Sequence, residues 1–482
     1  MSSKLTDNKV AVNRFLFLLF LSFFLINQRG LSVEIRCQNT NYAGKTLKFI
    51  TYSDPISGKT ETAFKLTFDA AGKASASFDI KKTSYVFSDF GVFRGMLFLE
   101  AGKNIDLKLP PFREKSFADE KNPYFSPVSF WLITEDKNQL TDKVSEFEQF
   151  FNYLTDKYFN ELYIKQSKPV FDSIKTELDK KVPDTAVETL VWHKNLKLKL
   201  IEADIFRLRP EAYSAGFNTV QSEYWLQPAF MEVFNKTFDR QLSFSALAVH
   251  GDDVKKAVET KDLPGLKSFV EKKYKVTGKT AELVLLKLLH DGFYSDEFSK
   301  TAIKDLVGNN LFVQNSNSIL KVTARNILDK FGFLLKGSKA PAICLNNLDG
   351  QKQCTNEDRG KFKYIVFADV ETRVCQEQLK YLSRINELFN KYLEIYVVLR
   401  NTGKESINTF FEQQKVPAVK LLDTNNAVIK QYKIRSFPQC FLLNEKHEVV
   451  FEYAKTPLDG FEQQFGEWLR NELFMRQRNQ HK

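Results

Sequence analysis

The chain has 482 residues, of which 43% are hydrophobic and 27% are charged. At roughly 100–200 residues per domain this length predicts about two to four domains. The composition excludes a mostly disordered or collagenous chain, and the mean hydropathy of −0.33 excludes a polytopic membrane protein. The net charge is +11, but acidic residues interrupt the basic ones throughout. We therefore expect a solvated surface and no nucleic-acid partner, while the charge leaves association with an anionic membrane open.

The N-terminal segment has the order of a secretory signal peptide. Lys4, Lys9 and Arg14 precede the apolar stretch 15–26, and small residues follow at positions 30 and 32. This stretch is short for a membrane span. We predict that residues 1–32 are a signal peptide and that the chain is exported, with an uncleaved membrane anchor as the alternative.

Export changes the interpretation of the five cysteines. Disulfides are the default expectation in an oxidising compartment. Because five is an odd number, at least one thiol is free or pairs outside the chain. The cysteines are Cys37, Cys344, Cys354, Cys375 and Cys440.

Residues 33–121 show alternating apolar and polar positions in short segments about ten residues apart, with turns at Gly72 and Gly102. This pattern predicts an antiparallel β-sandwich. From 122 to 335 the period becomes helical, and prolines divide the region into helices. Its aromatic stripes are typical of a core rather than of a ligand groove. Its histidines are far apart in sequence, so we predict no metal site.

Residues 336–482 return to a mixed pattern. A fully apolar strand at 363–368 is followed by a helix, a second strand at 393–399, another helix, two strands and a final helix. This order is thioredoxin-like. The whole chain is thus predicted to be a multidomain α+β protein, with a β-sandwich, a central all-α region and a C-terminal α/β domain.

The C-terminal region resembles the TlpA-like branch of thioredoxin-fold proteins. The resemblance comprises GSKAP at 337–341, a hairpin turn at 348–350, the core strand near Phe367 and the segment that leads to Pro438, where the family has a cis-proline. With Asn122-Pro-Tyr-Phe in its middle, the whole chain further resembles exported thioredoxin-like proteins common in the Bacteroidota. That resemblance implies a fold and a cell-envelope location, and no cofactor.

The active-site motif departs from this family. A TlpA-like reductase carries C-x-x-C at the start of the helix after the first core strand, where the helix dipole favours the first thiolate. Here the tetrad runs from Thr372 to Cys375, so only the second cysteine remains. Without the first sulfur, the usual exchange and resolution cycle is not available within the motif.

Thr372 has two interpretations. It is a good helix N-cap, able to accept a bond from a first-turn amide. Alternatively, Thr-x-x-Cys resembles the peroxiredoxin pattern, which also needs an arginine near the sulfur, for which Arg373 and Arg435 are the candidates. In that pattern a proline stands four residues before the threonine, and this chain has Ala368 there.

The remaining cysteines suggest two pairings. Cys440 lies two residues after Pro438, and in this fold the cis-proline loop packs against the start of the helix that carries Cys375. One prediction is therefore that Cys375 and Cys440 form a disulfide or a close thiol pair. The alternative interpretation is that both are small buried hydrophobic residues. Cys344 and Cys354 face each other across the hairpin if its register holds, which predicts a structural disulfide. A slip of one residue would separate them.

Two further sites come from the resemblance. Ser173 follows Asp172, and Thr185 follows Asp184, and each is followed by an apolar residue. These triplets resemble the O-glycosylation signal of exported Bacteroidota proteins.

We therefore expect a periplasmic or outer-membrane-associated protein that acts as a non-catalytic binding or assembly subunit with protein partners in the cell envelope. The alternative is a thiol-disulfide oxidoreductase or thiol peroxidase that uses Cys375, with Cys440 as resolving thiol. A third hypothesis, an enzyme site in the helical region, lacks any constellation of catalytic residues that we can name.

Overall fold

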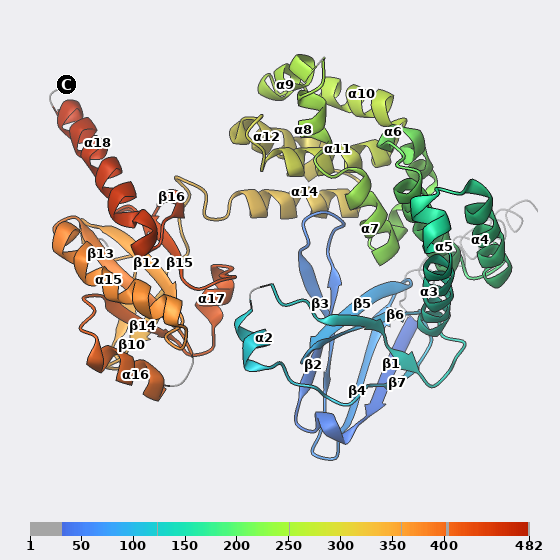
Figure 1. Ribbon diagram of the computed structural model, residues 1–482, viewed down its shortest axis with the longest axis horizontal. Helices are drawn as coiled ribbons and strands as arrows, with labels where there is room; N and C mark the ends of the chain where they lie inside the picture. Colours follow the sequence, from blue (N-terminus) through green and yellow to red (C-terminus); the bar gives the residue numbers. More distant parts are fainter. Residues whose placement is uncertain (1–30, 123, 250, 358, 402–403, 481–482) are drawn as a thin grey trace, which may run out of the picture. The chain divides into compact units, whose positions relative to one another are not determined.

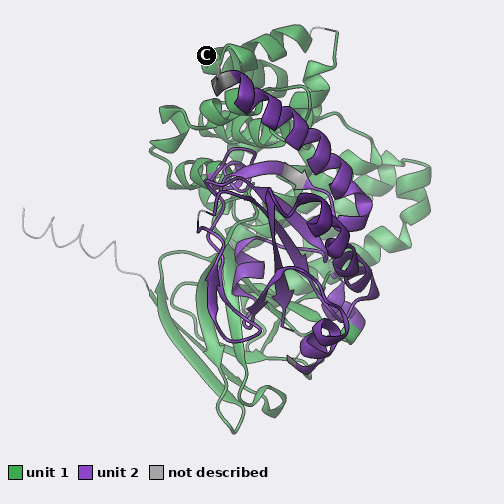
Figure 2. Cartoon of the chain, turned by 90° about the vertical axis from the view of Figure 1, so that its left-hand side faces the viewer, with its two compact units in different colours: residues 1–117, 126–328 green, residues 118–125, 329–482 purple. Residues whose placement is uncertain are grey.

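The computed structural model describes residues 31–480 except 123, 250, 358 and 402–403. All but the last two positions of the predicted signal peptide lie outside this part. The chain forms two compact units, coloured in Figure 2: residues up to 117 with 126–328, and residues 118–125 with 329–482. Within the described residues, no helix is both long and apolar enough to cross a membrane.

The first unit begins with a β-sandwich (Figure 1). Its four-stranded sheet has the order β4-β1-β7-β9, and its five-stranded sheet the order β3-β2-β5-β6-β8. In β1 the side chains of Val33, Ile35 and Cys37 are buried between the sheets, while the residues between them point outward. The bounds are β1 Leu31–Gln38, β2 Thr46–Tyr52, β3 Thr60–Thr67, β4 Lys73–Ile80, β5 Ser84–Phe90, β6 Phe93–Leu99, β7 Ile105–Lys108, β8 Val128–Trp131 and β9 Ile133–Thr134.

The sandwich differs from the prediction in two ways. It does not end at residue 121, because β8 and β9 complete the two sheets beyond that point. It is also not purely antiparallel, since β1 pairs with β7 and β6 with β8 in parallel. β8 and β9 are short edge strands of four and two residues, too short to show a clear period of two. Alternation of apolar and polar residues therefore could not predict these two strands.

The helices that follow belong to the same unit. Prolines stand in the first turn of several of them, as Pro210, Pro228 and Pro264 do, where a missing N–H is tolerated. The bounds are α3 Leu140–Lys157, α4 Lys168–Lys181, α5 Glu188–Ile205, α6 Pro210–Tyr213, α7 Pro228–Thr237, α8 Gln241–Ala246, α9 Gly251–Glu259, α10 Leu263–Tyr274, α11 Gly278–Gly292, α12 Lys300–Val307, α13 Asn310–Val313 and α14 Ser318–Phe331. The last of these helices continues past the boundary between the units at residues 328 and 329.

The sandwich and the first helices share one hydrophobic core. The face of the five-stranded sheet that points away from the sandwich interior carries Phe98 and Trp131, and these pack with Val144 and Phe147 of α3. A sheet that is apolar on both faces needs a second covering layer. The expected boundary between residues 121 and 122 is therefore not a boundary between independent cores.

A polar cluster ties this sheet to the helices. Glu148 of α3 accepts hydrogen bonds from Trp131 Nε1 at 2.6 Å and from His193 Nε2 of α5 at 2.9 Å. Lys197 lies 3.8 Å from the same carboxylate. Burial by itself would raise the pKa of Glu148, but the hydrogen bonds and charges of His193, with the charge of Lys197, lower it overall.

The second unit is built on a seven-stranded sheet of order β11-β10-β14-β13-β12-β15-β16. β12 is parallel to β13, and β13 to β14, whereas β15 and β16 are antiparallel. All seven residues of β12 are buried, as a central strand covered on both faces requires. The bounds are β10 Cys344–Asn347, β11 Lys352–Cys354, β12 Phe362–Ala368, β13 Leu393–Arg400, β14 Val419–Asp423, β15 Gln439–Leu443 and β16 Val449–Ala454.

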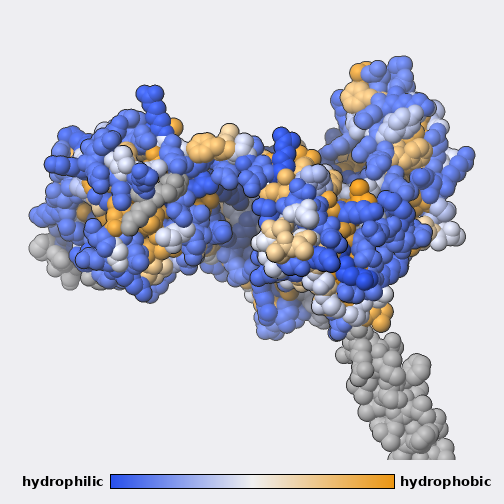
Figure 3. Space-filling model, turned by 90° about the horizontal axis from the view of Figure 1, so that it is seen from below, coloured by the Kyte–Doolittle hydropathy of each residue, from blue (hydrophilic) through white to orange (hydrophobic). Residues whose placement is uncertain are grey.

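Helices cover both faces of this sheet. One core contains residues of α15 (Arg373–Phe389), α16 (Lys404–Gln413) and α18 (Glu462–Gln480), and the other contains residues of α17 (Ala427–Gln431). The prediction missed β14 and α17, which lie between α16 and β15. The multidomain α+β class with a C-terminal thioredoxin-like domain is confirmed. On the face in Figure 3, hydrophilic residues predominate and apolar ones are scattered among them, as is usual for a protein surface.

The Glu148 cluster makes a testable contribution to stability. Glu148→Gln removes the carboxylate that accepts from Trp131 and His193, so we expect it to lower the free energy of unfolding at pH 7 by about 1–3 kcal/mol. Because the folded-state pKa of Glu148 is lowered, the stabilisation is present above the ordinary carboxyl pKa and is lost as the pH falls through the folded value. Urea unfolding followed by tryptophan fluorescence, at several pH values, measures the difference.

Glu146→Gln is the matched control, because Glu146 lies on the same helix and is exposed. It should change the free energy of unfolding by less than about 0.5 kcal/mol. Equal losses for both variants, or a Glu148→Gln effect that does not shrink in acid, would contradict the assigned role.

Candidate functional site

The candidate site lies where β12 ends and α15 begins. Asp369 follows the strand directly, and Thr372 occupies the N-cap position of α15. The side chain of Thr372 does not cap the helix as predicted. Its hydroxyl instead donates to the carbonyl oxygen of Asp369 at 2.9 Å, and its backbone N–H donates to the same oxygen at 3.1 Å. The Thr372 side chain therefore stabilises the turn before the helix and does not accept a hydrogen bond from the first-turn amides.

Cys375 lies in the first turn of α15 and is fully buried, with 0% of its surface exposed. It packs in the same core as Ala368 and Leu379. Burial raises the pKa of Cys375; the backbone N–H of Asp369 and the neighbouring Thr372 hydroxyl oppose this only in part. Burial therefore favours the protonated thiol form of Cys375.

Cys440 shares the core that surrounds this thiol, and it lies two residues after Pro438. The Phe437–Pro438 peptide bond is cis and immediately precedes β15, where Cys440 pairs in register with Val366 of β12. Cys375 and Cys440 are both buried and not bonded to each other, and the charge of a Cys375 thiolate is near enough to raise the pKa of Cys440. Burial is the main cause that raises this pKa to about 12. The structure thus brings the two thiols together without a disulfide.

A buried ion cluster adjoins the site, and sequence reasoning did not find it. Only 1% of the Asp369 side chain is exposed, and its Oδ2 lies 2.5 Å from Lys121 Nζ and 3.4 Å from Arg400 Nη1. Lys121 Nζ is also 2.8 Å from Glu371 Oε2. Asp369 could have been suspected as a carboxylate placed directly after a buried strand. Lys121 stands in α2 (Phe117–Lys121), 248 residues earlier, and carries no sequence signal.

The arginines expected for a peroxiredoxin-type site are not at the sulfur. Arg373 and Arg435 are both exposed. The cation that acts on Cys375 is Lys121, and its charge lowers the pKa of the thiol by less than burial raises it. The site therefore departs from the peroxiredoxin arrangement at this group as well.

Cys344 and Cys354 form a disulfide at the edge of the same sheet. They lie directly opposite in the β10–β11 hairpin, with their Cα atoms 4.2 Å apart and an S–S distance of 2.08 Å. This bond joins edge strands in the hairpin that precedes β12. It closes a short loop and is placed to support the hairpin rather than to exchange with Cys375.

The two candidate glycosylation residues are exposed and belong to the first unit. Ser173 lies on α4, and Thr185 lies between α4 and α5. Asp172, which precedes Ser173, pairs with Lys168 at 3.1 Å.

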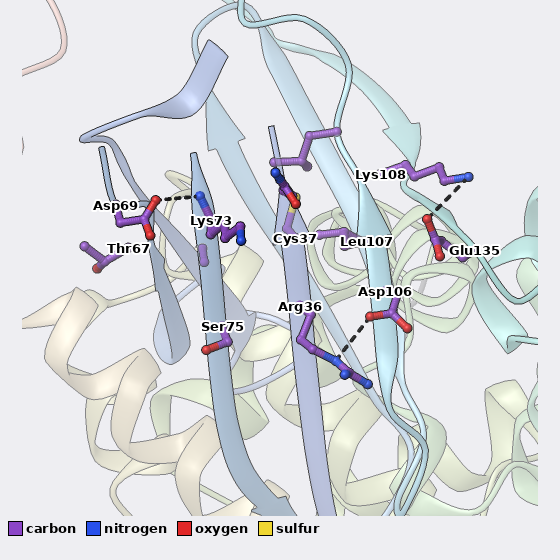
Figure 4. A pocket seen from close by; sticks show the side chains of 13 residues that line it. Arg36, Cys37, Thr67, Asp69, Lys73, Ser75, Asp106, Leu107, Lys108 and Glu135 are labelled. Atoms are coloured by element: carbon purple, nitrogen blue, oxygen red, sulfur yellow. Dashed lines mark hydrogen bonds and ion pairs between the residues drawn. The ribbon is translucent and has the colours of Figure 1, made fainter. Parts of the chain in front are cut away.

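A groove of about 880 Å³ on the sandwich has no catalytic chemistry (Figure 4). Its charged side chains are largely matched within it, as Arg36 is with Asp106 at 3.2 Å and Lys108 with Glu135 at 3.7 Å. Its thiol, Cys37, is buried, and burial raises the pKa of this thiol to about 11. The groove therefore offers no accessible thiolate as a nucleophile.

Residues 336–452 match the AhpC/TSA family. A thiol-disulfide oxidoreductase ResA from Bacillus cereus is 24% identical over 133 residues, which are 26% of this chain and 75% of that protein. Among solved structures, the thioredoxin domain of a thiol-disulfide oxidoreductase from Bacteroides vulgatus is 25% identical, with coverage of 27% and 94% of the two chains and a TM-score of 0.25. A thiol:disulfide interchange protein from a Bacteroides species is 26% identical, with coverage of 27% and 90% and a TM-score of 0.25.

The C-terminal region is thus an AhpC/TSA-type thioredoxin-fold domain, and the resemblance to TlpA-like proteins is confirmed. The comparisons cover about a quarter of the chain.

The reactivity of Cys375 tests the site. Because its pKa is raised, little thiolate is present near pH 7–8, and we expect alkylation by iodoacetamide in the native protein to be slow and to accelerate only in alkali. Peptide mass spectrometry after timed labelling gives the rate. In urea, we expect labelling with the pH dependence of an unperturbed thiol at all three free cysteines, Cys37, Cys375 and Cys440. Fast labelling of Cys375 in the native protein at neutral pH would refute the assignment.

Proposed function

We propose that this is an exported cell-envelope protein whose thioredoxin-fold domain binds a protein partner and does not catalyse thiol-disulfide exchange. The observation that carries the proposal is the pair of residues at the start of α15: threonine stands where the attacking thiol belongs, and Cys375 is fully buried. Exchange requires an accessible thiolate, and the domain provides a buried thiol of raised pKa.

Exposed apolar residues in the first turn of α15 and in the segment packed against it support the binding role. Val374 is 62% exposed and Leu458 is 48% exposed. Gln378, one turn after Val374, accepts a hydrogen bond from the backbone N–H of Leu458 at 2.7 Å, so the segment that carries Leu458 packs against the first turns of α15. We assign these exposed apolar residues to the contact with the protein partner.

The cell-envelope location rests on the sequence. The basic and then apolar order of residues 1–32 supports export to a periplasmic or outer-membrane location of the Bacteroidota type. The disulfide between Cys344 and Cys354 agrees with an oxidising compartment. O-glycosylation at Ser173 and Thr185 belongs to the same proposal, because both side chains are exposed.

A second candidate function is a thiol enzyme that uses Cys375. The proximity of Cys375 and Cys440 favours it, because a resolving thiol must lie close to the attacking one. Such an enzyme must first expose both thiols. Peroxide consumption by the wild type that disappears in Cys375→Ser would favour this candidate over the binding function.

Restoring the missing thiol tests the proposed function. Thr372→Cys places a cysteine at the N-terminus of α15, three residues before Cys375, where the helix dipole lowers a thiol pKa. We expect this variant to reduce insulin in the presence of dithiothreitol at least about 100-fold faster than the wild type, whose rate should equal that of the reductant alone. Turbidity of precipitating insulin chains measures the rate.

Lys380→Cys is the matched control, because it adds an exposed thiol on α15 without the C-x-x-C spacing. It should leave the rate at the level of the wild type. Insulin reduction by the wild type itself, at a rate near that of Thr372→Cys, would overturn the non-catalytic assignment.

A further inference from the structure

The helix α18 leaves the core of its domain part-way along its length. Phe465 and Leu469 are buried, and Trp468 and Leu473 pack against the same core. From residue 474 to residue 478, every residue is exposed. Figure 1 shows this last part of α18 projecting beyond the strands of the sheet. The packing that fixes the first half of the helix therefore does not extend to its end.

Two apolar side chains lie on this projecting part. Phe474 is 63% exposed and Met475 is 48% exposed. Phe474 follows the buried Phe465 by nine residues, which is about two and a half helical turns and places the two rings on opposite sides of the helix. Packing against the sheet therefore does not cover Phe474, and its ring is free to contact a surface outside the domain.

Two arginines flank Phe474 on the same face of the helix. Arg470 stands four residues before it and Arg478 four residues after it, a spacing that aligns side chains along one face. Both arginines are exposed, and within the part of the chain that the structure describes neither has an ion-pair partner. Arg470, Phe474, Met475 and Arg478 are called the arginine face below.

The other charges of the helix do not cancel these two arginines. Arg476 is itself compensated, because it pairs with Glu445 and with Glu472, each at 2.8 Å. The exposed Glu467 lies one turn before Arg470, and among the described residues no ion pair joins the two. Two positive charges thus share this side of the helix with one carboxylate. The complement to such a face is an anionic surface with an apolar phase beneath it.

We propose that the arginine face of α18 docks on an anionic phospholipid bilayer. Arg470 and Arg478 bind lipid phosphates, because a guanidinium donates two parallel hydrogen bonds to a phosphate group. Phe474 and Met475 enter the boundary between headgroups and acyl chains, where apolar side chains leave water. The net charge of the chain, +11, has the sign that an anionic bilayer attracts. This inference goes beyond the proposed function, because it holds whether or not the thiol site binds a protein.

Co-sedimentation of the exported chain with lipid vesicles tests the proposal. One set of vesicles contains about 30% phosphatidylglycerol in phosphatidylcholine, and the other contains phosphatidylcholine alone. An arginine at an anionic surface contributes about fivefold to the partition coefficient, so we expect Arg470→Gln/Arg478→Gln to bind the anionic vesicles at least about tenfold more weakly than the wild type. Phe474→Ser should weaken binding at least about threefold, because it removes the inserted ring.

Lys430→Gln/Arg435→Gln is the matched control, because it removes two exposed positive charges from the same unit. Lys430 lies on α17, which covers the other face of the sheet from α18. This control should bind within about twofold of the wild type, since its charges lie outside the arginine face. All variants share the same N-terminal segment, so a difference between them cannot come from it.

Three results would overturn the proposal. The first is equal binding of the wild type to the two kinds of vesicle, or binding to neither. The second is unchanged binding of Arg470→Gln/Arg478→Gln. The third is an equal loss in Lys430→Gln/Arg435→Gln, which would show that net charge acts rather than one face of α18. If the first double variant does not fold, Phe474→Ser and the comparison of the two vesicles with the wild type decide.

Discussion

The carboxylate of Asp369 is the constraint on which the thioredoxin-fold unit depends. It follows the central strand directly and is almost fully buried, so it must be paired or hydrogen-bonded. Its side chain meets Lys121 and Arg400 and accepts from the N–H of Glu371, while its carbonyl oxygen accepts from Thr372. Removing one partner of such a buried pair typically costs about 3–5 kcal/mol. One residue thus sets the turn, the start of α15 and the path of a distant segment.

The same arrangement decides the state of the thiol. The N-terminus of α15 favours a nearby anion, but such an effect is worth about 0.3–1 kcal/mol and at most about 2. One unit of pKa corresponds to about 1.4 kcal/mol, and burial of a thiol can exceed that. In Cys375 burial prevails, because its pKa is raised despite the helix, Lys121 and the Asp369 backbone N–H. A cysteine at position 372, which is half-buried, would experience the same dipole with less burial. Replacement of this one residue therefore distinguishes the present site from that of a reductase.

The elements that the sequence could predict are those with a strong local pattern. The fully apolar β12, the face of α15 and the hairpin that joins Cys344 to Cys354 all follow from periodicity and turn residues. The strands β8, β9 and β14 could not be predicted in the same way, because they are short and gain stability from neighbours distant in sequence. The cap expected of Thr372 also failed, since a local rule cannot anticipate the competing carbonyl of Asp369.

Lys121 marks the limit of prediction more clearly. Its partner lies 248 residues away, and no local pattern links the two. Contacts across such separations are physically feasible because the entropy of loop closure grows slowly, by about 0.6 kcal/mol for each doubling of loop length. A buried ion pair can exceed that cost. Residues 118–125 are continuous with the first unit at both ends, so Lys121 reaches Asp369 from a short excursion of the chain. The contact is specified by the buried carboxylate at its far end, and a pattern within the excursion itself could not reveal it.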